Sequence, residues 1–162
     1  MQIALLSRSP SSDIDHGFME SALAAARFAG QRGEVPIGAV VVHEGTIVAV
    51  GYNDCIARSD PTAHAEVMAL RAAGEQVGNY RLTGTTLYTT VEPCLMCVGA
   101  ALHARVERIV FGCCEPKVGA LGSAYDVGSD QRGNHRLVAR GGVCAAEARA
   151  LLQAFFRMRR GA

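Results

Sequence analysis

The chain has 162 residues, of which 49% are hydrophobic and 19% are charged. At roughly 150 residues per domain this length predicts a single domain, and the composition excludes a disordered tail or a disulfide-stapled miniprotein. Apolar stretches stay well short of the ~20 residues that span a bilayer, so we expect no membrane partner. The formal net charge of +1, taken alone, argues against a nucleic-acid partner.

The charges are unevenly distributed along the chain. Residues 1–100 contain 6 basic against 10 acidic residues, a net −4, whereas residues 101–162 contain 10 basic against 5 acidic residues, a net +5. Lys117 is the only lysine among the 16 basic residues, and the guanidinium of arginine suits phosphate contacts and base stacking better than an ammonium does. A GC-rich genome would also explain this arginine bias.

The six cysteines fit a reducing compartment. The amino terminus has no basic n-region and only the short apolar run from Ile3 to Leu6, so we recognise no signal peptide and expect a cytoplasmic protein. Clustered cysteines in a reducing cytosol more often bind metal or carry out redox chemistry than form structural disulfides.

Hydrophobic periodicity predicts helices and strands that alternate along one domain, residues 15–162, after a flexible leader, residues 1–14. The predicted elements are, in chain order, helix Asp15–Gly30, strands Val35–His43 and Thr46–Tyr52, helix Ala63–Ala73, strand Thr86–Val91, helix Cys94–Ala104, strands Arg108–Gly112 and Leu137–Val143, and helix Ala145–Arg160. Glu44-Gly45 predicts an antiparallel hairpin. The later alternation predicts parallel crossovers and a sheet covered on both faces, and the glycine-rich residues 112–133 predict a functional loop.

Two short motifs begin predicted helices: His64-Ala65-Glu66 and Pro93-Cys94-Leu95-Met96-Cys97. Cys94 and Cys97 are three residues apart, so both lie on one side of the first helical turn, where the helix dipole favours thiolates. Two thiolates and one imidazole predict a three-ligand zinc site whose fourth position is open to water.

Glu66 follows His64 by two residues and is expected to reach the water rather than the metal. Zinc lowers the pKa of bound water to about 7, so a neighbouring carboxylate can accept its proton and return that proton to the substrate. A thioredoxin-type redox pair and a structural zinc domain are the alternatives. The joint pattern of His-x-Glu followed by Pro-Cys-x-x-Cys favours a zinc nucleobase deaminase.

Five segments carry a resemblance to a known family: residues 53–54, 60–71, 92–97, 134–136 and 155–160. From about residue 15 to its end the chain resembles the bacterial tRNA-specific adenosine deaminases, the TadA family. The resemblance implies a three-layer α/β/α sandwich of the cytidine deaminase type with a mixed five-stranded sheet. It also implies a homodimer whose partner subunit contributes to RNA binding.

The resemblance further implies a substrate, which is the wobble adenosine, position 34, in the anticodon stem-loop of tRNA-Arg with anticodon ACG; the product is inosine. By the same resemblance, one zinc per subunit is held by His64, Cys94 and Cys97, and Glu66 transfers protons. Asn53 binds the flipped base, and Glu115 lies near the ribose. The RNA contacts come from Arg157, Arg159 and Arg160. A free guanine or cytosine deaminase with the same zinc chemistry is the alternative.

Several of these residues also have simpler explanations. Asn53 could cap a strand at a turn, and the three arginines could neutralise the dipole at a helix C-terminus. Cys113-Cys114 departs from the family pattern; this pair could bind a second metal or oxidise, but we interpret it as incidental. Cys55 and Cys144 are interpreted as residues without a role.

Overall fold

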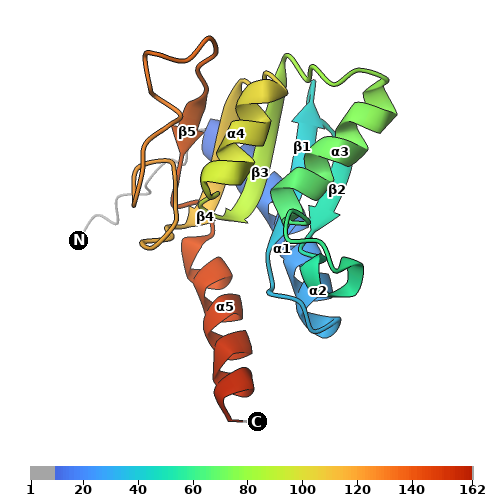
Figure 1. Ribbon diagram of the computed structural model, residues 1–162, viewed down its shortest axis with the longest axis vertical. Coiled ribbons are helices and arrows are strands. Elements are labelled where there is room, and N and C mark those ends of the chain that lie inside the picture. Colours follow the sequence, from blue (N-terminus) through green and yellow to red (C-terminus); the bar gives the residue numbers. More distant parts are fainter. Residues whose placement is uncertain (1–9, 162) are drawn as a thin grey trace, which may run out of the picture.

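A computed structural model describes residues 10–161, which form a five-stranded sheet between two layers of helices (Figure 1). The elements are α1 (Pro10–Gln31), β1 (Gly38–His43), β2 (Thr46–Tyr52), α2 (Cys55–Arg58), α3 (Ala65–Val77), β3 (Thr85–Val91), α4 (Leu95–His103), β4 (Arg108–Cys113), β5 (Val138–Arg140) and α5 (Ala145–Arg160). None of the helices described is long and apolar enough to cross a membrane.

The sheet is mixed, as the sequence predicts. The strand order is β2-β1-β3-β4-β5, in which β1 is antiparallel to both β2 and β3, and β3-β4 and β4-β5 are parallel. The structure therefore confirms both the hairpin at Glu44-Gly45 and the parallel crossovers. The three-layer sandwich with a mixed five-stranded sheet is the observed architecture.

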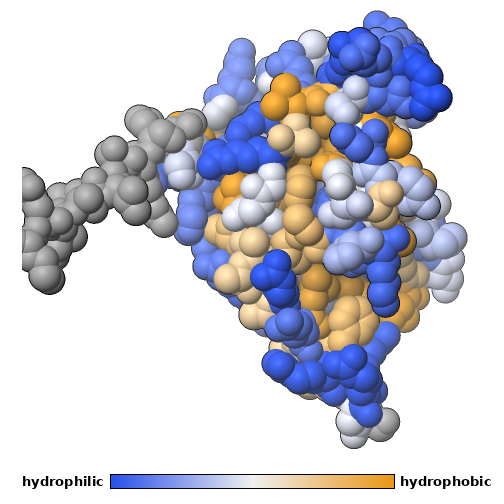
Figure 2. Space-filling model, turned by 90° about the vertical axis from the view of Figure 1, so that its left-hand side faces the viewer, coloured by the Kyte–Doolittle hydropathy of each residue, from blue (hydrophilic) through white to orange (hydrophobic). Residues whose placement is uncertain are grey.

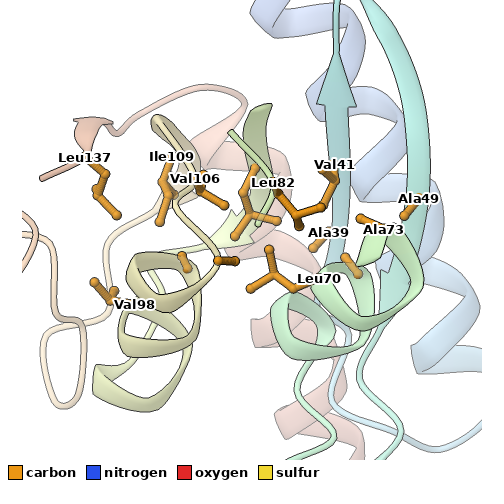
Figure 3. Close-up of a cluster of buried hydrophobic side chains, with 14 of the residues drawn as sticks. Ala39, Val41, Ala49, Leu70, Ala73, Leu82, Val98, Val106, Ile109 and Leu137 are labelled. Atoms are coloured by element: carbon orange, nitrogen blue, oxygen red, sulfur yellow. The ribbon is translucent and has the colours of Figure 1, made fainter. Parts of the chain in front are cut away.

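Alternate residues of the strands build two separate cores. In β1, Ala39 and Val41 pack under α3 and α4, whereas Val40 and Val42 pack under α1 and α5. Figure 3 shows the first core, to which Leu70 of α3 and Val98 of α4 both belong. Because each core joins one helical layer to the sheet, the first turns of α3 and α4 are fixed side by side over one face.

Two glycines allow helices to lie directly on the hairpin. A Cβ on Gly38 would lie 2.1 Å from the carbonyl oxygen of Ala22 in α1, and a Cβ on Gly51 would lie 2.3 Å from the carbonyl oxygen of Ala65 in α3. Both distances are far below van der Waals contact, so only glycine permits this approach. The contact at Gly51 sets the position of the first turn of α3.

The first helix begins at Pro10, five residues before the expected start at Asp15. Proline suits the first turn of a helix because its fixed φ is helical and its missing N–H is not needed there. Residues 10–14 therefore belong to α1, and residues 1–9 of the expected leader lie outside the described residues.

A buried carboxylate on α1 joins the helix to three strands. Asp15 accepts hydrogen bonds from Tyr88 on β3 at 2.8 Å, from Arg108 on β4 at 2.6 and 2.8 Å, and from Arg140 on β5 at 2.5 Å. Burial alone would raise the pKa of Asp15, but the hydrogen bonds and the two guanidinium charges outweigh it and lower the pKa. The sequence pattern did not reveal this cluster.

Candidate active site

The two predicted motifs meet at the starts of α3 and α4. His64 and Cys94 are the N-cap residues of these helices, and neither side chain caps its own helix. The Nδ1 atom of His64 lies 3.7 Å from the Sγ of Cys94 and 3.5 Å from the Sγ of Cys97, and the two sulfurs are 3.8 Å apart. All three donor atoms therefore face one point.

This triangle fits a tetrahedral zinc ion. Zinc bonds of 2.0–2.3 Å place tetrahedral ligand atoms about 3.3–3.8 Å apart, which matches the three separations. Two sulfurs and one imidazole nitrogen are also the donor types that zinc prefers over hard cations. With three protein ligands, such a centre keeps one position for water or substrate.

The electrostatics of the group prepare it for a cation. Hydrogen bonds from Cys97 and His64 lower the pKa of the Cys94 thiol to about 3, and the hydrogen bond to Cys94 raises the pKa of His64. The hydrogen bond between Cys97 and Cys94, together with burial, raises the pKa of the Cys97 thiol. The group thus favours a thiolate at Cys94, and metal binding would displace the proton from Cys97.

Glu66 lies beside the triangle rather than within it. Its Oε2 atom is 3.5 Å from the Sγ of Cys97, and the residue is 4% exposed. Burial, the largest effect, raises the pKa of this carboxyl. A carboxyl with a raised pKa next to the open position of a metal can both accept and release a proton.

Asn53 lies close to the same motif. It follows β2 and is buried, and the next residue, Asp54, donates its backbone N–H to the carbonyl of Ala63, directly before His64, at 3.0 Å. The side-chain Nδ2 of Asn53 faces Glu34 Oε2 at 3.5 Å. Asn53 is thus held against the start of α3 and is not a freely exposed turn residue.

Glu34 is a site residue that the sequence did not reveal. It is 1% exposed, and its Oε1 accepts the backbone N–H groups of Ile56 and Ala57 at 2.8 and 2.9 Å, while its other oxygen faces Asn53. One carboxylate therefore orients the Asn53 amide and the short helix α2 together. A lone acidic residue before a β-rich run gives too weak a signal to suggest this.

Glu92 organises the glycine-rich loop beside Cys94. The residue is 3% exposed and accepts the backbone N–H groups of Glu115, Leu121 and Ser123, each at 3.0 Å, and the hydroxyl of Ser123. The loop also pairs with the metal motif itself, because Ala120 donates to the carbonyl of Pro93 at 2.9 Å. The glycine-rich loop therefore packs against the start of α4, and it contains no helix within its described residues.

The remaining predicted RNA-binding residues gather around α5. Glu115 and Arg160 line one pocket of about 590 Å³ between the loop and α5. Arg159 lies over the Phe155 ring at 4.8 Å and donates to the carbonyl of Gly33 at 3.1 Å, directly before Glu34. Arg157 is exposed. Figure 2 shows hydrophilic residues clustered at the lower end of the molecule, where α5 ends.

Comparisons with known proteins fit this geometry. Residues 12–113 match the cytidine and deoxycytidylate deaminase zinc-binding region. The chain is 46% identical over 150 residues to the tRNA-specific adenosine deaminase of Haemophilus influenzae, covering 92% of this chain and 87% of that one. This chain belongs to the tRNA-specific adenosine deaminase family. The family member of Bacillus subtilis is 41% identical over 143 residues, or 88% of this chain and 89% of that one.

Solved structures agree with this family and fold. A structure from a study of A-to-I editing by tRNA:A34 deaminases matches with a TM-score of 0.81 and 42% identity, over 84% of this chain and 99% of that one. A guanine deaminase from Bacillus subtilis is 40% identical but matches only 60% of this chain and 63% of its own, with a TM-score of 0.59. Within the tRNA-specific adenosine deaminase family zinc is the cofactor, and His64, Cys94 and Cys97 supply the donor set that fits it.

Two of the remaining cysteines lie at the end of β4. Cys113 is buried and Cys114 is exposed. Within residues 10–161, neither belongs to a cluster of three metal-ligating side chains. The interpretation of this pair as incidental remains a prediction.

Proposed function

We propose that this chain hydrolyses adenosine to inosine at wobble position 34 of transfer RNA, and that its substrate is tRNA-Arg with anticodon ACG. The observation that carries the proposal is the metal-binding triangle with Glu66 beside it. This arrangement occurs in a chain that is 46% identical, over 92% of its length, to a tRNA-specific adenosine deaminase.

His64, Cys94 and Cys97 would hold the zinc ion. When bound, zinc acts as a Lewis acid that lowers the pKa of a coordinated water to about 7. The starts of α3 and α4 hold the three donor atoms 3.5–3.8 Å apart, so little rearrangement is needed to bind the ion.

Glu66 would move the protons of the reaction. Water adds its oxygen to C6 of adenine while Glu66 takes one proton from that water and passes it to ring N1. Glu66 then moves the proton of the new C6 hydroxyl to the exocyclic amine, the C6–N bond breaks as the C6 carbonyl forms, and ammonia leaves. Adenosine and water thereby give inosine and ammonia, and the carboxylate is restored. The raised pKa of Glu66 suits this double role.

Asn53 would hydrogen-bond the flipped base. Glu34 supports this role because it accepts from Nδ2 of Asn53, while the Cys55 thiol donates to Oδ1 at 3.8 Å, so the amide is held in one orientation. The target base has to leave its stack, at a cost of a few kcal/mol, which an anticodon loop lowers relative to a duplex. Single-stranded loop RNA is therefore the expected substrate.

Arg157, Arg159 and Arg160 would hold the anticodon stem-loop, with Glu115 close to the bound nucleotide. In support, Arg159 donates to the carbonyl of Gly33, directly before Glu34, and Arg160 shares a pocket with Glu115. The end of α5 thus contacts the residue before Glu34 and lies beside the loop that contains Glu115. Exposed guanidinium groups there offer phosphate contacts whose strength falls with salt.

A homodimer is the proposed assembly. The sequence of α4 is LMCVGAALH, and only Cys97, Val98 and Ala101 are buried within the chain. Its outward side presents Leu95, which is exposed, and Leu102, which is half-buried. A helix that is apolar all round needs a partner on its outer face, and a second copy would supply one. We place the protein in the cytoplasm, with its tRNA substrate.

The test is inosine formation on a synthetic anticodon stem-loop with adenosine at the wobble position. Zinc-loaded protein should convert that adenosine and release ammonia, and an otherwise identical RNA with guanosine there should stay unchanged. An unmodified adenosine after prolonged incubation would refute the proposal.

A free guanine or cytosine deaminase is the competing function, and the partial match to the guanine deaminase of Bacillus subtilis favours it. Removal of residues 155–162 separates the two functions. The truncation should abolish conversion of the RNA if the α5 arginines hold the stem-loop. If the chain instead deaminates a free base, which makes no phosphate contacts, the truncation should leave that activity unchanged. Turnover of free guanine by the full chain would support the alternative.

A further inference from the structure

A second group of metal-ligating side chains lies on the other face of the sheet. His16 and Glu20 belong to α1, and Cys144 directly precedes α5; their donor atoms all lie within 4.8 Å of one another. Helices α1 and α5 cover the face opposite to α3 and α4, which hold the catalytic group. Within the part of the chain that the structure describes, three such side chains converge only in these two groups.

The local structure brings the three residues together. His16 and Glu20 are four residues apart on α1, so they share one face of that helix. Cys144 is buried at the N-cap of α5 in the left-handed region, with φ of 55°, after Gly142 with φ of 89°. This tight turn directs the chain from β5 back to α1, and the start of α5 favours a thiolate at Cys144.

The donor set is chemically suited to zinc. An imidazole nitrogen, a carboxylate oxygen and a thiolate sulfur are all zinc ligands, whereas calcium and magnesium take oxygen ligands alone. Tetrahedral zinc needs donor separations of about 3.3–3.8 Å, so any wider spacing within this group has to close when the ion binds. Glu20 is exposed and His16 half-buried, and rotation of these two side chains can supply that movement.

The surroundings can complete the coordination. A pocket of about 400 Å³ is lined by His16, Cys144, Arg140 and Glu147, which gives space for a fourth ligand, either water or the Glu147 carboxylate. The positive charge of Arg140 is balanced by Asp15, which its guanidinium contacts at 2.5 Å, so Arg140 repels a cation in this pocket only weakly. A thiolate and a carboxylate would neutralise the charge of the zinc ion.

From this geometry we infer that His16, Glu20 and Cys144 form a second, structural zinc site that joins α1 to α5. The site differs from the catalytic centre in its donors, with one thiolate and one carboxylate instead of two thiolates. A metal at this place links residues 20 and 144, which lie far apart in the sequence, and stabilises the folded state by binding it in preference to the unfolded chain.

The test is the zinc stoichiometry of the full-length protein, measured by titrating zinc into metal-free protein and by elemental analysis after gel filtration. Wild type should bind two zinc ions per chain. The Glu20→Gln and Cys144→Ser variants should bind one, or bind the second at least tenfold more weakly. Glu20 is exposed, so its substitution keeps the fold even if Cys144→Ser does not. The controls Glu75→Gln and Cys114→Ser, an exposed carboxylate and an exposed thiol elsewhere, should keep two.

A cobalt measurement separates this inference from the proposed function. In a Cys94→Ala/Cys97→Ala double variant, which should be inactive, added Co²⁺ should still give a thiolate-to-cobalt absorption band. That band should disappear when Cys144→Ser is added. One zinc per wild-type chain, or a second zinc that persists in Glu20→Gln and Cys144→Ser, would overturn the inference whatever the deaminase activity.

Discussion

Replacement of Glu92 by glutamine tests how the glycine-rich loop is held over the catalytic centre. Oε1 of Glu92 accepts the N–H groups of Leu121 and Ser123, and Oε2 accepts the N–H of Glu115 and the hydroxyl of Ser123. A glutamine keeps one oxygen, which can serve Leu121 and Ser123. Its NH₂ group can donate to the Ser123 hydroxyl but cannot accept from Glu115.

The expected loss follows from these contacts. Each hydrogen bond to a charged acceptor contributes about 1.5–3 kcal/mol, and a buried donor left without an acceptor costs about 1–3 kcal/mol. One bond is lost and the others no longer have a charged acceptor, so we expect Glu92→Gln to lower the free energy of unfolding by about 3 kcal/mol. For a chain of this size that corresponds to a melting temperature lower by roughly 6–12 °C.

Urea denaturation and calorimetry of the zinc-loaded protein measure this loss. The matched control is Glu107→Gln, an exposed carboxylate with one hydrogen bond to the N–H of Gly84 at 3.2 Å, which should change the free energy of unfolding by less than about 0.5 kcal/mol. Equal stability of Glu92→Gln and wild type would show that the carboxylate does not anchor the loop.

Three further substitutions probe the other buried contacts. Glu34→Gln places an NH₂ group against either the Asn53 amide or the N–H groups of α2. The value of kcat/KM on the stem-loop should therefore fall about tenfold, or about 1.4 kcal/mol, with zinc content unchanged. An unaltered kcat/KM would contradict the positioning of Asn53 by Glu34. Asp15→Asn leaves two partly exposed arginines without their carboxylate. Urea denaturation should show a free energy of unfolding lower by about 2–3 kcal/mol. A change below about 1 kcal/mol would show that solvent screens the cluster. Gly51→Ala forces a Cβ into the backbone of α3 and should destabilise the folded protein by about 1–3 kcal/mol. Gly17→Ala, in open space on α1, should stabilise it by about 0.5–1 kcal/mol. An equal effect of the two substitutions would argue against the close approach of Gly51 to α3.

The metal centre could be predicted because its ligands occur in short motifs. His64, Cys94 and Cys97 all lie at helix starts, so their residue types and spacing already indicate where the donors point. The alternation of strands and helices likewise predicted a sheet covered on both faces, and the structure shows which helices cover each face. Local periodicity and local motifs were sufficient for these features.

The carboxylates that support the site could not be predicted in this way. Glu92 binds backbone N–H groups 23 to 31 residues away, and Glu34 binds N–H groups 22 and 23 residues away. A backbone N–H has no side-chain signature, so nothing in the sequence marks these partners. Cys144 was interpreted as a residue without a role for a related reason, because only the fold brings it to His16 and Glu20.

Substitution of Glu66 by alanine tests the central claim most directly, with zinc content and inosine formation measured on the same sample. The account predicts one catalytic zinc retained at His64, Cys94 and Cys97, an unchanged melting temperature within about 2 °C, and loss of inosine formation on the anticodon stem-loop by at least a thousandfold. Inosine formation at the wild-type rate by Glu66→Ala would contradict the account. Loss of the catalytic zinc together with activity would instead support a structural role for the metal.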